Sequence, residues 1–204
     1  MIAIIDYDAG NIRSVEKAFA FLGESAAVTR DPETILNADG VVLPGVGAFG
    51  DAMDKLRAYG LDRVVRECVD RNKPFLGICL GLQLLFAESE ESPGVEGLHI
   101  LEGRIVRIPS DQGLKVPHIG WNSLQFQTDS RLFENLPENP FVYFVHSFYL
   151  QAADTEIVTA TADYGVQIHA SVEKGNLFAC QFHPEKSSDV GMQMLRNFIK
   201  VVKG

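Results

Sequence analysis

The first half of the chain alternates short apolar runs with segments of helical periodicity, and this alternation limits the possible folds more than any other feature. Apolar runs of strand length cover residues 2–6, 26–29, 41–43 and 75–78. Helical spacing follows each run, over residues 12–22, 32–36, 48–71 with a break near Gly60, and 80–88. Strands that alternate with helices pair in parallel, and right-handed crossovers place the helices on both faces of the sheet. The first half therefore predicts a doubly wound α/β sheet.

The second half, after Pro93-Gly94, is richer in strands. Strand patterns cover residues 100–108, 141–150, 156–162, 166–172 and 177–182, with hairpin turns at 164–165 and 174–176. Mixed or antiparallel pairing is expected in this part. A last helix over residues 190–202 should pack back on the sheet. Because no repeat, linker or low-complexity tract interrupts the 204 residues, we expect a single domain over residues 1–204.

Composition and charge exclude several classes of partner. The net charge of −9 and the pI near 5.0 oppose the basic surface that nucleic acids and anionic membranes require. No apolar run approaches the roughly 20 residues of a membrane-spanning helix, and the first residues lack the basic start of a signal peptide. Three cysteines, Cys68, Cys79 and Cys180, are too few for a disulfide framework. We therefore expect a cytoplasmic protein with free thiols and with neither a nucleic-acid nor a membrane partner.

The segment around Cys79 has the order strand, tight turn, helix. Its pattern Gly77-x-Cys79-x-Gly81 matches a nucleophile elbow with cysteine in place of serine, and the glycines leave room for close packing of strand against helix. Because the turn places Cys79 at a helix N-terminus, free N–H groups and the helix dipole favour its reactive thiolate, and the Leu80 N–H could hold an oxyanion. The alternative is a buried structural cysteine in a glycine-flanked turn, which accounts less well for the flanking strand and helix.

A cysteine nucleophile needs a base, and His183 is the strongest candidate among the five histidines. It follows an apolar strand and begins His183-Pro-Glu185, so Glu185 could turn back and orient the imidazole in a Cys-His-Glu triad. Read alone, this string would indicate an ordinary loop histidine, and its weight comes from the elbow upstream.

A second glycine turn, Pro44-Gly-Val-Gly47, follows the third strand. Its backbone N–H groups could hold the negative charge of a tetrahedral intermediate, although chain reversal alone would also explain the glycines. This turn and the elbow both lie at the carboxyl ends of parallel strands, where α/β sheets bind ligands. Together with His183 they predict acyl transfer. No Cys or His pair has zinc spacing, and no phosphate-binding loop lies in its usual context, so neither a metal nor a cofactor is expected.

The three signatures Pro44-Gly-Val-Gly47, Gly77-Ile-Cys79-Leu-Gly81-Leu-Gln83 and His183-Pro-Glu185 resemble, in order and spacing, those of the class I (triad) glutamine amidotransferases. The likeness spans almost the whole chain. It implies a flavodoxin-like α/β domain with a central, largely parallel sheet, helices on both faces and an added antiparallel β-rich part in the second half.

The resemblance also implies an activity, the hydrolysis of L-glutamine to glutamate and ammonia through a γ-glutamyl thioester. Cys79 would attack the side-chain amide, His183 would transfer protons, and Glu185 would fix His183. Backbone groups of Gly47 and Leu80 would form the oxyanion hole. The groups that would bind glutamine are the Gln83 side chain and the main chain of Ser147 and Phe148.

Further strings resemble one branch of that family, the glutaminase subunits that serve histidine biosynthesis. They are Ile5-Asp-Tyr7-Asp-Ala-Gly10-Asn11, Pro117-His118-Ile-Gly120-Trp121-Asn122, Tyr143-Phe-Val-His146-Ser147-Phe148-Tyr149 and Gln181-Phe-His-Pro-Glu-Lys186-Ser187. The branch passes its ammonia to a (β/α)8-barrel cyclase subunit in a heterodimer, and the cyclase makes imidazole glycerol phosphate and AICAR.

Length also indicates a partner, since one glutaminase-sized domain uses all 204 residues and leaves no segment for an ammonia acceptor. Trp121, Tyr143 and Lys186 are candidates for the partner interface, with core packing of the aromatics and a solvated lysine as alternatives. Because free glutaminase would waste glutamine, the isolated chain should be nearly inactive. The cyclase and its ligand should activate it, through a reorientation of the Val46 peptide.

Three other functions stay open at this point. A glutaminase subunit of anthranilate, aminodeoxychorismate or purine synthesis is disfavoured by the string that contains Trp121. A stand-alone cysteine hydrolase would turn over a substrate other than glutamine without a partner. A catalytically inert regulatory subunit is disfavoured by the intact Cys79, His183 and Glu185.

Overall fold

The centre of the molecule is a sheet of eight strands in the computed structural model, which describes residues 1–110, 113–126 and 129–204. The strand order is β2-β1-β3-β4-β13-β12-β11-β8. The parallel strands are β1 (Ile2–Ile5), β2 (Ala26–Thr29), β3 (Gly40–Gly45), β4 (Phe75–Cys79) and β13 (Leu177–Cys180). The antiparallel continuation consists of β12 (Gln167–Lys174), β11 (Val158–Asp163) and β8 (Gln125–Phe126).

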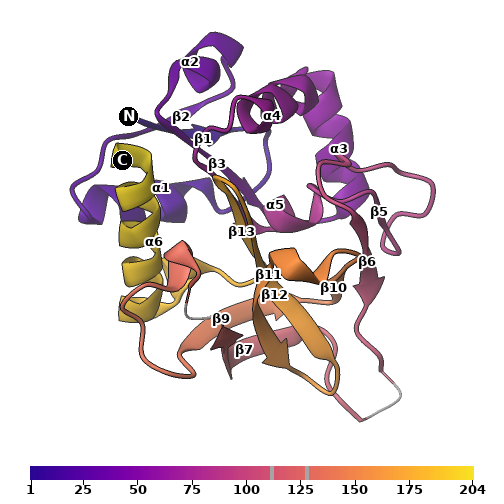
Figure 1. Cartoon of the computed structure of the whole chain (residues 1–204). Coiled ribbons are helices and arrows are strands. Elements are labelled where there is room, and N and C mark those ends of the chain that lie inside the picture. The colour runs from indigo at the N-terminus through magenta and orange to yellow at the C-terminus, as the bar shows by residue number, and fades with distance from the viewer. Residues whose placement is uncertain (111–112, 127–128) are drawn as a thin grey trace.

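Two smaller sheets flank the carboxyl edge of the parallel strands. One has the order β10-β6-β5 and consists of β10 (Phe148–Ala152), β6 (Gly103–Arg107) and β5 (Glu88–Ser89). The other is an antiparallel pair of β7 (His118–Ser123) and β9 (Phe141–His146), which we call the β7–β9 ribbon. In Figure 1 the ribbon lies at the end of the molecule away from α2 and α4.

The helices cover both faces of the large sheet (Figure 1). They are α1 (Ile12–Phe21), α2 (Pro32–Asn37), α3 (Phe49–Ala58), α4 (Leu61–Asp70), α5 (Leu80–Gln83) and α6 (Ser188–Lys203), with single 3-10 turns at Arg131–Phe133, Thr155–Ile157 and Pro184–Lys186. Local sequence sets several of these boundaries. Asp31 caps α2 by accepting from the Thr34 N–H at 2.8 Å, and Gly60 separates α3 from α4 in the left-handed conformation.

Alternate residues of each central strand enter two apolar cores. Ile2 and Ile4 face the core under α1 and α6, whereas Ala3 and Ile5 face the core under α2, α3 and α4. Strands buried on both faces are expected to be continuously apolar, which is what the sequence of β1 shows. The predicted α/β fold with an added antiparallel part is confirmed. None of the helices among the described residues is both long and apolar enough to span a membrane.

The helix predicted over residues 80–88 is wrong in length, because α5 ends at Gln83 and Glu88 lies in β5. The reason is tertiary. The carbonyls of Leu84 and Leu85, which a longer helix would use, accept instead from the N–H groups of Leu98 and Ile100 at 2.8 Å.

Strand boundaries in the second half also differ from the prediction. The strand predicted over residues 141–150 is divided at Ser147 into β9 and β10. Of the strand predicted over residues 100–108, only the residues of β6 form a strand. The strands β5, β7 and β8 were not predicted. β3 also continues through Pro44 and Gly45 rather than ending before them.

Candidate active site

Cys79 occupies the sharp turn between β4 and α5. Its backbone has φ 56° and ψ −110°, a conformation that costs energy for any residue with a Cβ and is typical of strained functional turns. The two flanking glycines permit the turn: a Cβ on Gly81 would overlap the Leu43 carbonyl oxygen, and one on Gly77 would lie 2.9 Å from the Gly81 carbonyl oxygen. The predicted elbow is therefore present, with β3, β4 and α5 in close contact.

The sheet order brings His183 to the same edge. β13 is the parallel neighbour of β4, with Cys180 paired to Ile78, so the residues that follow β13 reach the turn that follows β4. The backbone of His183 is fixed by the ribbon, because its N–H donates to the Tyr143 carbonyl at 3.0 Å. Cys79 and His183 line one cavity of about 450 Å³.

Glu185 orients the imidazole of His183. The His183 Nδ1 donates to Glu185 Oε1 at 2.8 Å, and both side chains are only 1% exposed. With Nδ1 protonated, Nε2 is the nitrogen left for the cysteine. Nε2 is buried and has no well-formed hydrogen bond within the described residues. It is therefore free to exchange a proton in the cavity.

The charge state of His183 is set by opposing effects. Burial alone would lower its pKa, but the Cys79 sulfur and the Glu185 carboxylate outweigh burial and raise the pKa of His183 to about 10. A protonated imidazole beside Cys79 stabilises a thiolate, which is the nucleophilic form of cysteine. Burial raises the pKa of the Cys68 thiol to about 11 and that of Cys180 well above its ordinary value, so both remain protonated thiols at neutral pH.

Glu185 is held in turn by the loop that follows β1. Asn11 Nδ2 donates to Glu185 Oε1 at 3.3 Å, and Ser14 Oγ donates to Asn11 Oδ1 at 2.8 Å. The sequence did not single out Asn11 as a site residue. Its contact joins positions 174 apart in the chain, so no local pattern could have indicated it.

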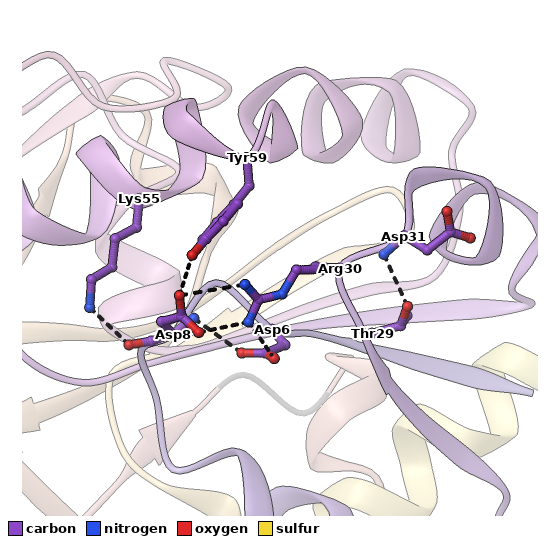
Figure 2. A network of polar contacts seen from close by, with 7 residues as sticks. All are labelled: Asp6, Asp8, Thr29, Arg30, Asp31, Lys55 and Tyr59. Atoms are coloured by element: carbon purple, nitrogen blue, oxygen red, sulfur yellow. Dashed lines mark hydrogen bonds and ion pairs between the residues drawn. The ribbon is translucent and has the colours of Figure 1, made fainter.

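A polar network supports this loop on its outer side (Figure 2). Arg30 Nη2 lies 2.8 Å from Asp6 Oδ2 and 2.6 Å from Asp8 Oδ1, the Tyr59 hydroxyl donates to Asp8, and Lys55 Nζ donates to the Asp8 carbonyl at 2.9 Å. Hydrogen bonds from Arg30 and Tyr59 lower the pKa of Asp8. Asp6, directly after β1, is therefore tied by Arg30 to the end of β2.

The glycine turn after β3 borders the same cavity. Gly47, with φ 99°, lines it together with Leu80 and Cys79. Tyr7 stabilises the turn, because its buried hydroxyl donates to the Pro44 carbonyl at 2.8 Å. Val46 is 40% exposed, so the peptide between Val46 and Gly47 lies at the surface of the cavity.

The residues predicted to bind glutamine border the same cavity as the glycine turn. Gln83, Ser147 and Phe148 all line it, and Gln83 Nε2 donates to the Phe148 carbonyl at 3.0 Å. The structure therefore brings together all the residues predicted for the triad, the oxyanion hole and the substrate site.

The three predicted interface residues form one cluster, of which Lys186 also lines the cavity. Trp121 and Tyr143 are opposite each other in the ribbon, with ring centroids 6.1 Å apart, and Lys186 Nζ lies 5.9 Å from the Tyr143 centroid. Trp121 is 52% exposed, so core packing is not its role. No group of three or more His, Cys, Asp or Glu residues within the described parts of the chain could hold a metal ion.

The class of the protein follows from this fold and from comparison with known sequences. Residues 3–202 match the family model of class I glutamine amidotransferases, and the chain belongs to that family. Solved glutamine amidotransferase structures share the fold at low sequence identity. One superposes with a TM-score of 0.78 at 22% identity over 100% of both chains. Another, from Thermotoga maritima, has a TM-score of 0.69 at 18% identity over 100% of this chain and 98% of its own.

Curated sequences that are about half identical to this chain define its branch. The imidazole glycerol phosphate synthase subunit HisH of Syntrophotalea carbinolica is 53% identical over 97% of this chain and 98% of its own length. HisH of Methanothermobacter thermautotrophicus is 51% identical over 100% of both chains. Within its family, this chain therefore groups with the glutaminase subunits of imidazole glycerol phosphate synthase.

Proposed function

We propose that this chain hydrolyses L-glutamine to glutamate and ammonia with a Cys79–His183–Glu185 triad, and supplies the ammonia to a cyclase subunit. The observation that carries this proposal is the convergence of a strained cysteine and a glutamate-bound histidine on one cavity. The family membership supplies the substrate class.

The geometry supports a two-step acyl transfer. The thiolate of Cys79 attacks the side-chain amide carbon of glutamine, and the carbonyl oxygen takes up the negative charge. The protonated Nε2 of His183 gives its proton to the departing ammonia, which leaves a γ-glutamyl thioester. Neutral His183 then takes a proton from water as the water attacks the thioester, and glutamate and the Cys79 thiolate are released. Glu185 keeps Nδ1 protonated throughout, so that Nε2 is the nitrogen that exchanges protons.

We assign the oxyanion hole to the backbone N–H groups of Gly47 and Leu80. Both residues border the cavity next to Cys79, and Leu80 is the first residue of α5. Donors of this kind elsewhere contribute about two to three powers of ten to rate. Gln83 and the main chain of Ser147 and Phe148 then hold the amino-acid end of glutamine. In this arrangement the Gln83 amide nitrogen is engaged by Phe148, which leaves its oxygen to accept from an ammonium group.

We propose that the partner is a cyclase with a (β/α)8 barrel, which makes imidazole glycerol phosphate and AICAR, and that it docks on the ribbon in a cytoplasmic heterodimer. The outer face of the ribbon is apolar: Ile119 is 59% exposed, Trp121 52% and Phe141 58%. Contiguous exposed apolar side chains mark protein interaction sites. Lys186 lies beside Tyr143 of this face and also lines the cavity, so a docked partner would contact the edge of the active site.

Activation by the partner would act at the glycine turn. A second cavity of about 370 Å³, lined by Ala9, Gly10 and Ala48 among others, lies on the other side of Val46 and Gly47. The Val46 peptide therefore has open space on two sides, which is compatible with a change of orientation. We expect the isolated chain to be slow and the complex to be fast.

Labelling of Cys79 tests the proposed function directly. A glutamine analogue with an electrophilic side chain should modify Cys79, and neither Cys68 nor Cys180, in the complex with the cyclase and its ligand. Peptide mass spectrometry locates the label. Absence of label at Cys79 in the complex would instead support a catalytically inert subunit, and turnover of a non-glutamine substrate without a partner would support a stand-alone hydrolase.

A further inference from the structure

A series of hydrogen bonds runs from the ribbon to the edge of the substrate site. His118, on β7, has its Nδ1 3.0 Å from His146 Nε2, on β9. The His146 Nδ1 lies 2.9 Å from the Phe148 carbonyl oxygen. The same oxygen accepts from Gln83 Nε2 at 3.0 Å. Both histidines are buried, with 3% exposure for His118 and 6% for His146.

The series continues to the nucleophile. Gln83 Nε2 also donates to Gln181 Oε1 at 3.0 Å, and Gln181 Nε2 donates to the Cys79 sulfur at 3.7 Å. Gln181 is fully buried, and it lies between β13 and His183. The bonds therefore connect β7 to the reacting sulfur without a break, and we call this set the polar chain: His118, His146, Gln83 and Gln181, with the Phe148 carbonyl.

Only one assignment of hydrogens satisfies the whole polar chain. The Phe148 carbonyl can only accept, so His146 carries its hydrogen on Nδ1, and its Nε2 accepts from His118 Nδ1–H. Burial lowers the pKa of His146 to about 3 and that of His118 to about 4, so both rings are neutral and have one hydrogen each. The two amide hydrogens of Gln83 are used by Phe148 and Gln181. The Gln181 amide hydrogen then points at sulfur.

This arrangement favours a thiolate at Cys79. An N–H donor stabilises an anionic sulfur and does nothing comparable for a neutral thiol. The other titratable groups that face Cys79 within the described residues are His183, Tyr7 and Cys180. Burial raises the pKa of both Tyr7 and Cys180, so they stay neutral and His183 supplies the positive charge.

We infer that Gln181 is a positioning residue that holds the Cys79 sulfur as a hydrogen-bonded thiolate, and that His118 and His146 fix the Phe148 carbonyl behind it. The part of this inference that concerns catalysis rests on the proposed glutaminase function. The part that concerns the sulfur does not, because thiolate reactivity is measurable without glutamine.

The first test compares Gln181→Met with Gln193→Met in the full chain. Methionine removes the donor from Gln181 at similar volume. Gln193 is a partly buried glutamine on α6 that bonds Asn197 at 2.9 Å and lines none of the cavities described above. The probe is iodoacetamide, with the rate of Cys79 alkylation followed against pH by peptide mass spectrometry.

We expect the midpoint of the alkylation profile to rise by about one pH unit in Q181M and to stay unchanged in Q193M. An unchanged midpoint in folded Q181M would overturn the inference. Gln181→Glu is the second variant, in case Q181M fails to fold. It keeps the acceptor for Gln83 but places an acceptor against the sulfur, so its midpoint should rise at least as far.

The second test separates hydrogen bonding from packing at His118. Its ring stacks on Tyr164, with centroids 3.9 Å apart, and on Phe144 at 4.8 Å. His118→Phe keeps the stacked ring and loses the donor, whereas His118→Asn loses the ring and keeps an N–H near the position of Nδ1. In the complex with the cyclase, H118F should raise KM for glutamine roughly fivefold with little change in kcat. H118N should have a KM close to that of the wild type.

The reverse order, with H118F like the wild type and H118N impaired, would show that packing alone matters and would overturn this part of the inference. The test also separates two kinds of failure. A wild-type complex without glutaminase activity would refute the proposed function, and the alkylation profiles would still decide the role of Gln181. An active wild type with unaffected variants would refute only the inference.

Discussion

At the scale of single residues, the Glu185 carboxylate is one of the two groups, with the Cys79 sulfur, that raise the pKa of His183. Glu185→Gln removes the carboxylate charge and leaves the shape, so the pKa of His183 should fall and its tautomer should no longer be fixed. In the complex, kcat/KM for glutamine should drop by about two to four powers of ten with the fold intact. Steady-state kinetics and circular dichroism check this. A loss of less than fivefold would remove Glu185 from the triad.

Close contact at Gly81 should make that position intolerant of any side chain. Gly81→Ala places a methyl group on the Leu43 carbonyl oxygen, where backbone rather than a flexible side chain must move. We expect a loss of at least about 3 kcal/mol in the free energy of unfolding, measured by urea denaturation.

Gly94→Ala is the matched comparison for Gly81→Ala. Gly94 has open space around it but a positive φ of 85°, so only the backbone penalty of about 1 to 2 kcal/mol should appear. Equal losses in the two variants would contradict the steric argument.

Site residues were predictable where their signal is local. Cys79 and its glycines occupy five consecutive positions, and the turn needs those residues for steric reasons. Asn11 and Gln181 were not predicted, because each contacts a candidate site residue more than a hundred positions away, Glu185 and Cys79 respectively. A lone amide in a sequence does not indicate its hydrogen-bond partner.

At the scale of elements, periodicity predicted most helices and central strands and failed where tertiary bonds replace local ones. α5 stops early because residues 97–101 take over the carbonyls of the 84–87 segment. β7 was missed because Gly120 and Asn122 are poor strand formers, and its strand structure depends on pairing with β9. The sequence therefore predicted the order of most helices and central strands along the chain, but not the residues at which they begin and end.

The histidine pair of the β7–β9 ribbon should make stability depend on pH. Burial lowers the pKa of His118 from 6.5 to about 4 and that of His146 from 6.5 to about 3. Between these lowered values and pH 6.5, the unfolded chain therefore binds more protons than the folded chain. Their contribution to stability is complete above pH 6.5 and is lost as the pH falls towards 4. The raised pKa of His183 acts in the opposite window, because its contribution is constant below 6.5 and is lost towards pH 10.

From pH 7 to pH 5 the free energy of unfolding should therefore fall by about 2 to 4 kcal/mol. Urea denaturation at pH 7, 6 and 5 measures this. His118→Asn removes one of the two titrating groups, so the free energy of unfolding should depend less steeply on pH in this variant. Burial also lowers the pKa of His169, but His169 is present in both the wild type and H118N and does not affect the comparison. A slope that is the same in H118N and the wild type would contradict the assignment to the pair.

At the scale of the whole molecule, two apolar cores lie on opposite faces of one sheet. This is consistent with the single domain predicted for residues 1–204, which stays a prediction. The carboxyl edge of the sheet holds the cavity, and the ribbon extends from that edge with an exposed apolar face. Partner binding and catalysis are therefore expected at adjoining surfaces.

The ribbon face should contribute to partner binding and little to stability. Phe141→Ala, at 58% exposure, should weaken binding of the cyclase by at least about tenfold while changing the free energy of unfolding by less than about 1 kcal/mol. Titration calorimetry measures the affinity. Phe21→Ala is the control, since Phe21 is 76% exposed at the end of α1 and outside the ribbon. Equal affinities of the two variants would place the interface elsewhere.

The most direct test of the account is the initial rate of glutamine hydrolysis by the isolated chain and by its complex with the cyclase and the cyclase's ribonucleotide ligand. We predict a slow rate for the isolated chain, a rise of roughly 10- to 100-fold in the complex, and no turnover in the complex with Cys79→Ala. A fast rate without the partner would contradict activation. A rate that survives Cys79→Ala would contradict the assignment of the nucleophile, on which the rest of the mechanism depends.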